Sequence, residues 1–300
     1  MRVAILCSSP YSETGCAVAS RLSQLGYAPV GALTLPSWDR STLTRKLGQW
    51  GLRDSLRYAR AKLAPGKSAN PKGVRNPYLE RALRHGERVF RSLSEVASVH
   101  GFPVATCRDQ NSPRAIAQLK QWAPDVAVFT GGNILRDELL HVPRLGVLNA
   151  HLALLPEIRG MSSPEWSLLC GVPLGITIHF VDGGIDTGPI LLRREFSAAN
   201  QCDSLTDLRN RMIAEGIELI AEAVTGLDRG TISAAAQTDR DRDNQFFVMH
   251  ERLKAETARR LMQGKLRKCE PRNGEPKNHE PENCETKTGR LNPVAGRSDG

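Results

Sequence analysis

The sequence predicts an α/β fold with a mostly parallel sheet and helices on both faces. Short apolar runs of strand length recur along the chain, and helix-compatible stretches separate several of them. Runs that are apolar throughout are typical of strands buried on both faces of a sheet. Apolar residues make up 40% of the 300 residues, which is enough for a sizeable core in one such unit with insertions.

The first apolar run extends from Arg2 to Cys7, and a helix-compatible stretch from Thr14 to Leu25 follows it. Gly26 then suits the end of that helix. The other predicted strands are 29–35, 103–107, 125–130, 145–150 and 175–181, with a helix over 114–122 between two of them. This succession indicates a Rossmann-like sheet, in which ligands bind at the carboxyl ends of the strands.

Residues 38–98 interrupt that succession with two helix-compatible segments, Leu43–Leu63 and Tyr78–Val96, around a turn-rich stretch at 65–73. Between Asp39 and Arg91 there are 14 Lys and Arg against 4 Asp and Glu, so 14 − 4 = +10, and the rest of the chain is nearly neutral. Such a block can attract phosphate, nucleic acid or an acidic surface, or can be the solvated face of two helices. We predict a basic helical insertion (38–98) within one catalytic domain, residues 1–263.

The end of the chain divides into a helix and a tail. Ser204 to Val224 has amphipathic spacing, and Ser204 is a good N-cap. From Gly264 onward the apolar periodicity is lost, and a Glu-Pro-x-Asn unit recurs from positions 270, 275 and 280. We therefore predict a disordered, low-complexity tail over residues 264–300.

Composition also excludes several classes. The seven cysteines form no CxxC pair, which argues against a disulfide framework and a zinc site, and no metal is expected. The apolar run near the start is too short for a signal peptide, and no stretch approaches the roughly 20 apolar residues of a membrane span. We expect a soluble, cytoplasmic protein without a membrane partner; the sequence does not define its oligomeric state.

Two segments carry polar residues in a pattern that indicates chemistry. Asn149 and His151 emerge from an apolar strand, and positions two apart on a strand share one face. Asp186 lies in a glycine-bearing loop after the strand at 175–181, and it joins them if that loop folds back. An amide donor beside an imidazole can hold a developing oxyanion, and an imidazole moves protons near neutral pH. A nearby carboxylate favours the protonated imidazole.

Together these segments resemble the folate-dependent formyltransferases, whose pattern is Asn-x-His-x-x-Leu-Leu-Pro, then Gly-x-Thr-x-His and Asp-x-Gly. The likeness is best over residues 124–190. It implies transfer from 10-formyltetrahydrofolate to an amine, with Asn149 and protonated His151 stabilising the tetrahedral oxyanion. Asp186 would keep His151 charged and relay the proton that the amine loses. His179 alternates with Ile178 and Phe180 in its strand, and we interpret it as structural.

The resemblance also implies that the folate ring lies against the backbone of two loops. The matching positions are Gly131, Gly132, Asn133, Ile134 and Leu135 in the first loop, and Val181, Asp182, Gly183, Gly184 and Ile185 in the second. Glycine at 131 and 132 lets a planar ring approach the main chain closely.

The acceptor is less well defined. Many members of the family have Pro-Ser where this chain has Leu152-Ala153, and the stretch 7–11 lacks the glycine-rich phosphate loop of members that act on glycinamide ribonucleotide. We favour a nucleotide-linked amino sugar or another small amine over methionyl-tRNA or glycinamide ribonucleotide; nucleic acid is a partner only if the acceptor is tRNA. The alternatives are a hydrolase that releases formate, a non-catalytic folate-binding protein, and an RNA-binding protein that uses residues 39–91.

Overall fold

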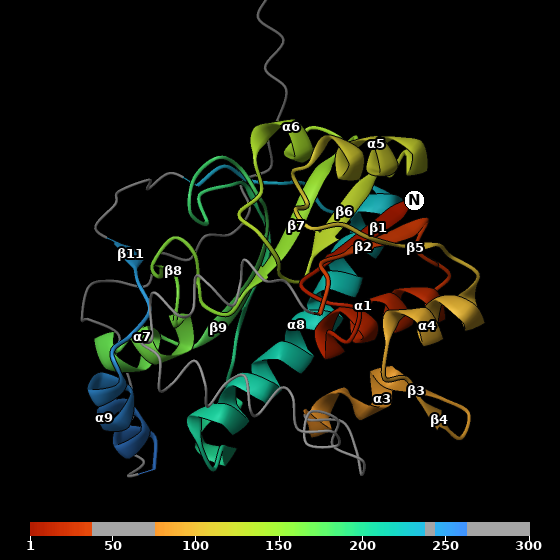
Figure 1. The fold of residues 1–300 in the computed structure, drawn as a ribbon. Coiled ribbons are helices and arrows are strands. Elements are labelled where there is room, and N and C mark those ends of the chain that lie inside the picture. The colour runs from red at the N-terminus through yellow and green to blue at the C-terminus, as the bar shows by residue number, and fades with distance from the viewer. Residues whose placement is uncertain (38–75, 238–243, 263–300) are drawn as a thin grey trace, which may run out of the picture. The chain divides into compact units, whose positions relative to one another are not determined.

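The computed structural model describes residues 1–37, 76–237 and 244–262. Its centre is a sheet with the strand order β10-β9-β7-β6-β1-β2-β5, which is Rossmann-like and mostly parallel (Figure 1). The strands of this sheet are β1 (Val3–Cys7), β2 (Gly31–Thr34), β5 (Val104–Thr106), β6 (Val126–Phe129), β7 (Gly146–His151), β9 (Gly175–Phe180) and β10 (Ile190–Glu195). Every strand predicted from the sequence is present, and β10 is an additional one.

The two strands at one edge run against the rest of the sheet. The pairs from β5 across to β7 are parallel, whereas β9 is antiparallel to β7 and β10 is antiparallel to β9. Consequently the residues that end β7 lie beside the middle of β9. In the register of this pair, Asn149 is opposite His179 and His151 is opposite Thr177.

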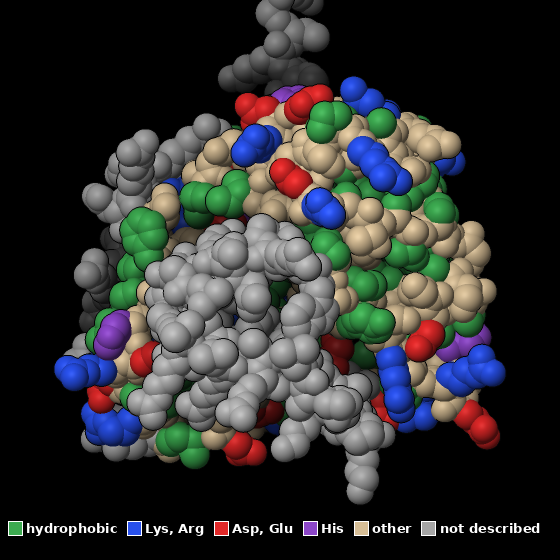
Figure 2. Space-filling model, in the orientation of Figure 1, with side chains coloured by type: hydrophobic (Ala, Val, Ile, Leu, Met, Phe, Trp, Pro, Cys, Tyr) green, Lys and Arg blue, Asp and Glu red, His purple; other side chains and the backbone are tan. Residues whose placement is uncertain are grey.

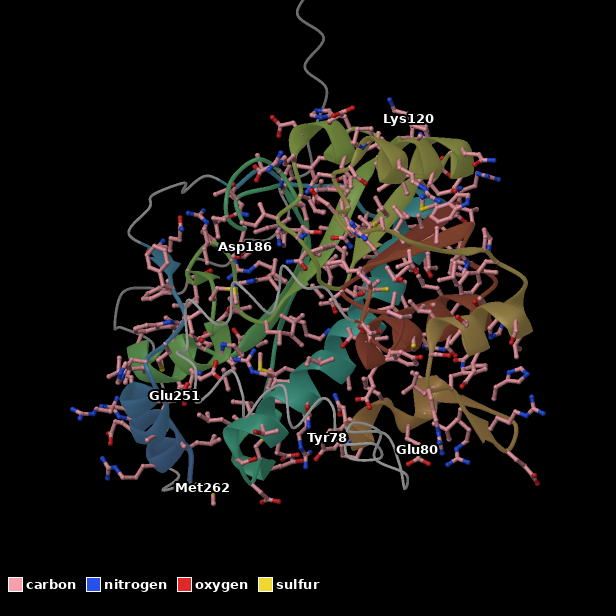
Figure 3. All side chains as sticks on the ribbon, viewed as in Figure 1. Tyr78, Glu80, Lys120, Asp186, Glu251 and Met262 are labelled. Atoms are coloured by element: carbon pink, nitrogen blue, oxygen red, sulfur yellow. The ribbon has the colours of Figure 1, made fainter. Side chains whose placement is uncertain are left out.

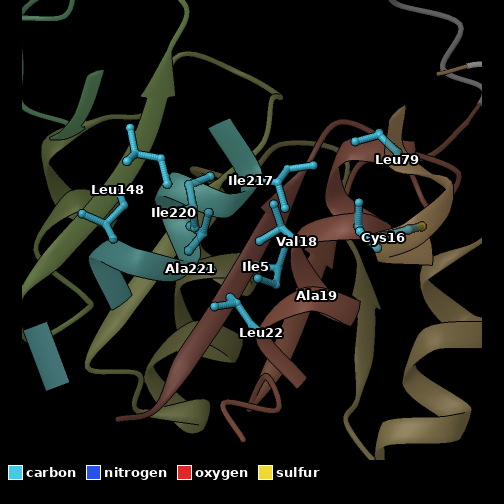
Figure 4. Packing of buried hydrophobic residues seen from close by; sticks show 14 of the residues in the cluster. Ile5, Cys16, Val18, Ala19, Leu22, Leu79, Leu148, Ile217, Ile220 and Ala221 are labelled. Carbon is cyan, nitrogen blue, oxygen red and sulfur yellow. The ribbon is translucent and has the colours of Figure 1, made fainter. Parts of the chain in front are cut away.

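Helices cover both faces of the sheet, as predicted. The main ones are α1 (Glu13–Gln24), α4 (Leu93–His100), α5 (Pro113–Trp122), α6 (Asp137–Leu140) and α8 (Leu205–Arg229). Successive strand residues point to opposite faces: Ile5 packs in the cluster under α1 and α8, and Leu6 packs in the cluster that includes residues of α5 and α6. Figure 4 shows Ile5 and Leu148 of the sheet in one cluster with Val18, Ile217 and Ile220 of the two helices.

Helix α8 supports the strand that carries the polar residues. Its predicted cap is present, because Ser204 Oγ accepts a hydrogen bond from the Asp207 N–H at 3.0 Å. The middle of the helix lies directly on β7 and β9: a Cβ at Gly216 would come within 3.6 Å of the Ala150 side chain and 3.8 Å of Ile176. The back of the sheet is therefore closely packed behind Asn149 and His151.

Two glycines in this packing give opposite expectations for stability. A Cβ at Gly31 on β2 would overlap the Trp122 ring, so Gly31→Ala is expected to destabilise the fold by about 1–3 kcal/mol. A Cβ at Gly216 meets only ordinary van der Waals contacts, so Gly216→Ala is expected to stabilise by about 0.5–1 kcal/mol through helix propensity. Urea unfolding of both variants measures the two free energies; the same sign for both would contradict the packing described.

The segment 76–98 differs from the prediction. A helix was predicted over Tyr78–Val96, but a hairpin divides this stretch: η1 (Pro77–Leu79) and α3 (Glu80–Leu83) precede it, and α4 follows it. The helix ends where Arg84 becomes extended. The hairpin strands are β3 (Arg84–His85) and β4 (Arg88–Val89), and their turn contains Gly86, whose φ of 59° is left-handed. Over this part of the molecule, basic and acidic side chains are mixed (Figure 2). The predicted helix at Leu43–Leu63 and the tail at 264–300 lie outside the described residues.

Several elements beyond β7 were not predicted. They are β8 (Arg159–Gly160), α7 (Ser163–Cys170), η2 (Ala198–Gln201), β11 (Gln245–Phe246) and α9 (Glu251–Met262). β8 and β11 form a small parallel pair, and Trp166 Nε1 donates to the Phe247 carbonyl at 2.8 Å. The C-terminal part of the described chain therefore returns to the loop that follows β7.

Candidate active site

The polar residues predicted from the two segments meet in one place. Asn149 and His151 lie on the same face of β7, and Asp186 comes from the loop between β9 and β10, which folds back toward them. The distance from His151 Nδ1 to Asp186 Oδ2 is 3.4 Å. Figure 3 labels Asp186 close to the β7 and β8 segments. We call Asn149, His151 and Asp186 the polar trio.

The loop after β7 defines which nitrogen of His151 carries a proton. His151 Nε2 lies 2.8 Å from the Ile158 carbonyl oxygen, and because that oxygen can only accept, Nε2 donates. In the neutral ring, Nδ1 then has the lone pair and faces Asp186. Thr177 Oγ1 holds this loop by donating to Ala153 O at 2.8 Å and accepting from the Leu155 N–H at 3.1 Å.

Asp186 is held on both of its carboxylate oxygens. Oδ2 accepts a hydrogen bond from the Gly160 N–H at 2.8 Å, and Oδ1 lies 3.5 Å from His179 Nε2. The Asp186 backbone has φ of 52°, a left-handed conformation that is uncommon for a residue with a side chain. The loop thus aims the carboxylate between the two histidines.

Burial and neighbouring charges act in opposite directions on the pKa values of His151 and Asp186. Burial lowers the pKa of His151 below its ordinary value of 6.5, and this effect outweighs the opposing attraction of Asp186; His179 lowers the pKa further. Burial acts to raise the pKa of Asp186, but His151, His179 and the Gly160 N–H together lower it to about 2. These directions favour a neutral imidazole beside an ionised carboxylate at neutral pH, whereas the resemblance implied a protonated His151; the charged form of His151 stays a prediction.

His179 contacts the trio, although the sequence led us to interpret it as structural. Its Nδ1 lies 2.8 Å from the Phe180 carbonyl and must donate to it, so Nε2 of the neutral ring is an acceptor. Asn149 Nδ2 donates to that atom across 3.2 Å. An asparagine amide has two N–H groups, and this contact orients the second one for a ligand. The position of His179 in the Gly-x-Thr-x-His part of the pattern could have marked it. Its contact with Asn149 depends on the register between β7 and β9, which the sequence does not give.

The first predicted folate-binding loop lies at the end of the sheet that carries the trio, whereas the second leaves β9 beside Val147, near the start of β7. Gly131–Leu135 follows β6, and a Cβ at Gly131 would lie 3.5 Å from the Ser8 side chain after β1. Buried Gln110 ties this loop down: its Oε1 accepts from the Asn133 N–H at 3.0 Å. Ile134 is 83% exposed and Ile185 of the second loop is 42% exposed, whereas Leu135 is buried.

The second loop, Val181–Ile185, starts from the sheet, and the Asp182 side chain stabilises its turn. The Val181 N–H donates to the Val147 carbonyl at 2.7 Å, and Asp182 Oδ1 accepts from Thr187 Oγ1 at 2.7 Å and from the Gly184 N–H at 3.1 Å. A Cβ at Gly183 would lie 3.4 Å from Asp137 Oδ1, at the start of α6 after the first loop. The two loops therefore approach each other, with apolar side chains exposed on both.

Gln237 is a further buried residue at the site that sequence reasoning missed. Its amide nitrogen donates to the carbonyls of Asp186 and Gly188, and its amide oxygen accepts from Arg159. No motif marked it, because it lies beyond the long helix α8 in a stretch without periodicity.

Other types of site receive no support within the described ranges. Among these residues, no group of three or more His, Cys, Asp or Glu side chains is arranged to hold a metal ion. Among the cysteines described there, Cys7, Cys16, Cys107 and Cys170 are free thiols. No helix in the described part of the chain is both long enough and apolar enough to cross a membrane.

Comparisons with known proteins find similarity over the same region. A family model described as formyl transferase matches residues 69–224, just over half of the chain. A curated methionyl-tRNA formyltransferase of Pelobacter propionicus is 34% identical over 149 residues, which cover 49% of this chain and 46% of that protein. Another, from Geobacter metallireducens, is 36% identical over 183 residues, covering 54% and 58%. The chain thus spans about half the length of the curated relatives it matches.

Solved structures resemble it more distantly. A phosphoribosylglycinamide formyltransferase from Bacillus halodurans has a TM-score of 0.49 and 20% identity, over 76% of this chain and 95% of that one. A formyltransferase from Anoxybacillus kamchatkensis, solved in complex with UDP-4,6-dideoxy-4-formamido-L-AltNAc and tetrahydrofolate, has a TM-score of 0.42 and 23% identity, over 51% and 78%.

Proposed function

The chain belongs to the formyl transferase family, and on that premise we propose that it transfers a formyl group from 10-formyltetrahydrofolate to a primary amine. The observation that carries this proposal is the meeting of Asn149, His151 and Asp186, from two separate segments, at the end of β7. These groups supply what acyl transfer to an amine requires: a donor for an oxyanion, a base, and a charge that stabilises the protonated base.

We propose one role for each of these residues. Asn149, oriented by His179, donates its second N–H to the formyl oxygen as the amine attacks the formyl carbon and that oxygen gains negative charge. His151 Nδ1 accepts the proton that the amine loses, and the nearby Asp186 carboxylate stabilises the imidazolium that forms. The bond from carbon to the folate nitrogen then breaks, and that nitrogen takes the proton from His151.

The folate donor is proposed to lie between the two loops after β6 and β9. Close approach of Gly183 to Asp137 brings these loops together, and the exposed side chains of Ile134 and Ile185 offer apolar surface for a planar ring. Backbone groups of Gly131, Gly132 and Asn133 in one loop, and of Asp182 and Gly184 in the other, would then contact the ring. Leu135 and Val181 would support the loops from the core side.

For the acceptor we propose a nucleotide-linked amino sugar or another small amine. The stretch 7–11 lacks the glycine-rich phosphate loop of members that act on glycinamide ribonucleotide, which disfavours that acceptor. Methionyl-tRNA is the second candidate, because the curated relatives reported above are named methionyl-tRNA formyltransferases. A catalytic domain over residues 1–263 and a cytoplasmic location remain part of the proposal.

The test is tetrahydrofolate release from 10-formyltetrahydrofolate, measured with and without amines. The amines are nucleotide-linked amino sugars, glycinamide ribonucleotide and methionyl-tRNA, and His151→Ala is the inactive control. Release that requires one amine and is lost in the control supports the transferase and identifies its acceptor class. Release without any amine would instead show a hydrolase, and folate binding without release under any condition would show a binding protein.

A further inference from the structure

Gln237 donates both side-chain N–H groups to the loop that carries Asp186, and its side-chain oxygen accepts from Arg159 on β8. Its Nε2 donates to the Asp186 carbonyl at 2.9 Å and to the Gly188 carbonyl at 2.7 Å, and its Oε1 accepts from Arg159 Nη2 at 2.9 Å. The residue is 6% exposed and Arg159 is 1% exposed. Gln237 lies outside the region 69–224 that the family model matches.

The backbone that Gln237 holds is unfavourable on its own. Asp186 has φ of 52°, and such conformations persist in non-glycine residues only where surrounding contacts determine them. Gly188 adjoins the same turn, where a Cβ would overlap the Phe180 carbonyl. Two hydrogen bonds from one buried amide to the carbonyls of 186 and 188 supply such contacts.

Strand β8 contacts the Asp186 carboxylate directly and the Asp186 backbone through Gln237. Arg159, which donates to Gln237, is followed by Gly160, whose N–H donates to the Asp186 carboxylate at 2.8 Å. β8 is itself paired with β11, with Arg159 opposite Gln245 and Gly160 opposite Phe246. One short strand, β8, therefore fixes the position of both the carboxylate and the backbone of Asp186.

We propose that Gln237 is a positioning residue, which fixes the loop backbone at Asp186 and Gly188 against Arg159 and thereby keeps the Asp186 carboxylate in contact with His151. The effect of Gln237 on catalysis rests on the proposed function, whereas the effect of Gln237 on the pKa of His151 does not. A residue beyond α8, outside the recognised motifs, would then determine the geometry of the polar trio.

The test compares wild type, Gln237→Met and Asp186→Asn in the full chain. Methionine has a similar volume and no charge but cannot donate to the two carbonyls. An NMR pH titration of the His151 ring, assigned by its loss in His151→Ala, reads the Asp186–His151 contact without substrate. The groups facing His151 are Asp186, which raises its pKa, and His179, which lowers it. We expect the pKa of His151 to fall in Gln237→Met, and to fall also in Asp186→Asn, because Asp186 raises it in the wild type.

Kinetics give a second readout. A displacement of a reacting group by about 1 Å costs about 10²-fold in rate, so kcat in Gln237→Met is expected to fall by about 10²-fold with little change in the KM of the folate donor. Near-UV circular dichroism verifies the fold. If Gln237→Met does not fold, Gln237→Glu retains the acceptor for Arg159 but loses both donors, and the same loss of kcat is expected. Gln118→Glu on α5 adds equal charge elsewhere and should leave kcat unchanged.

The outcomes separate the two proposals. An unchanged or raised pKa of His151 in folded Gln237→Met, or full kcat in Gln237→Glu, overturns the positioning role even if the wild type transfers formyl groups. A lowered pKa of His151 in a protein that transfers no formyl group supports the positioning role and rejects the proposed function.

Discussion

Replacing His151 with alanine is expected to lower kcat for formyl transfer by about 10³-fold, with little change in the KM of the folate donor. The ring is buried, its Nε2 is occupied by the Ile158 carbonyl, and Nδ1 is left as the base beside Asp186. Removing it leaves the attacking amine without a group to take its proton. The effect should be on kcat, because the base acts when the proton is transferred.

Tetrahydrofolate release at saturating amine measures this loss, with His85→Ala as the matched control. His85 is exposed on the short hairpin β3–β4, so its replacement is expected to leave kcat unchanged. A His151→Ala enzyme that retained wild-type kcat while its KM rose would contradict the assignment, since His151 would then serve only in binding.

The sheet and the trio were predictable because both depend on local patterns. Apolar runs mark β1, β6, β7 and β9, and a strand repeat of two residues places Asn149 and His151 on one face. The sequence places Asp186 beside His151 only if the loop after β9 folds back, and in the structure it does: Asp186 Oδ2 lies 3.4 Å from His151 Nδ1. Strand periodicity and motif spacing thus carry most of the site.

The charge on His151 and the contacts between residues far apart in the chain were not predictable from the sequence. The charge on His151 is decided between burial and the Asp186 carboxylate, and the extent of burial is known only once the loop at 153–158 is in place. His179 reaches the trio because β9 is antiparallel to β7, and a βα alternation gives no sign of that reversal. The role of Gln237 arises from a contact with a residue 51 positions earlier in the chain.

Asp186→Asn is expected to lower kcat by about 10²-fold or more while leaving the loop in place, because asparagine retains an acceptor for the Gly160 N–H but has no charge. The imidazolium formed on His151 then lacks the carboxylate that stabilises it. Since both residues act in one proton transfer, the variant carrying both His151→Ala and Asp186→Asn should be little slower than His151→Ala alone. Additive losses would indicate that Asp186 acts independently of His151.

The pH profile of this variant tests the same point with a definite sign. His151 must be neutral to accept a proton, so wild-type kcat falls as the pH drops through the pKa of His151, which lies below 6.5. Asp186 raises that pKa, and it stays ionised across this range because its own pKa is about 2. Removing its charge should therefore move the acid limb of the kcat profile to lower pH. If kcat instead falls as the pH rises through the pKa of His151, the protonated imidazole is the active form and His151 acts as an oxyanion donor, as the family resemblance implied.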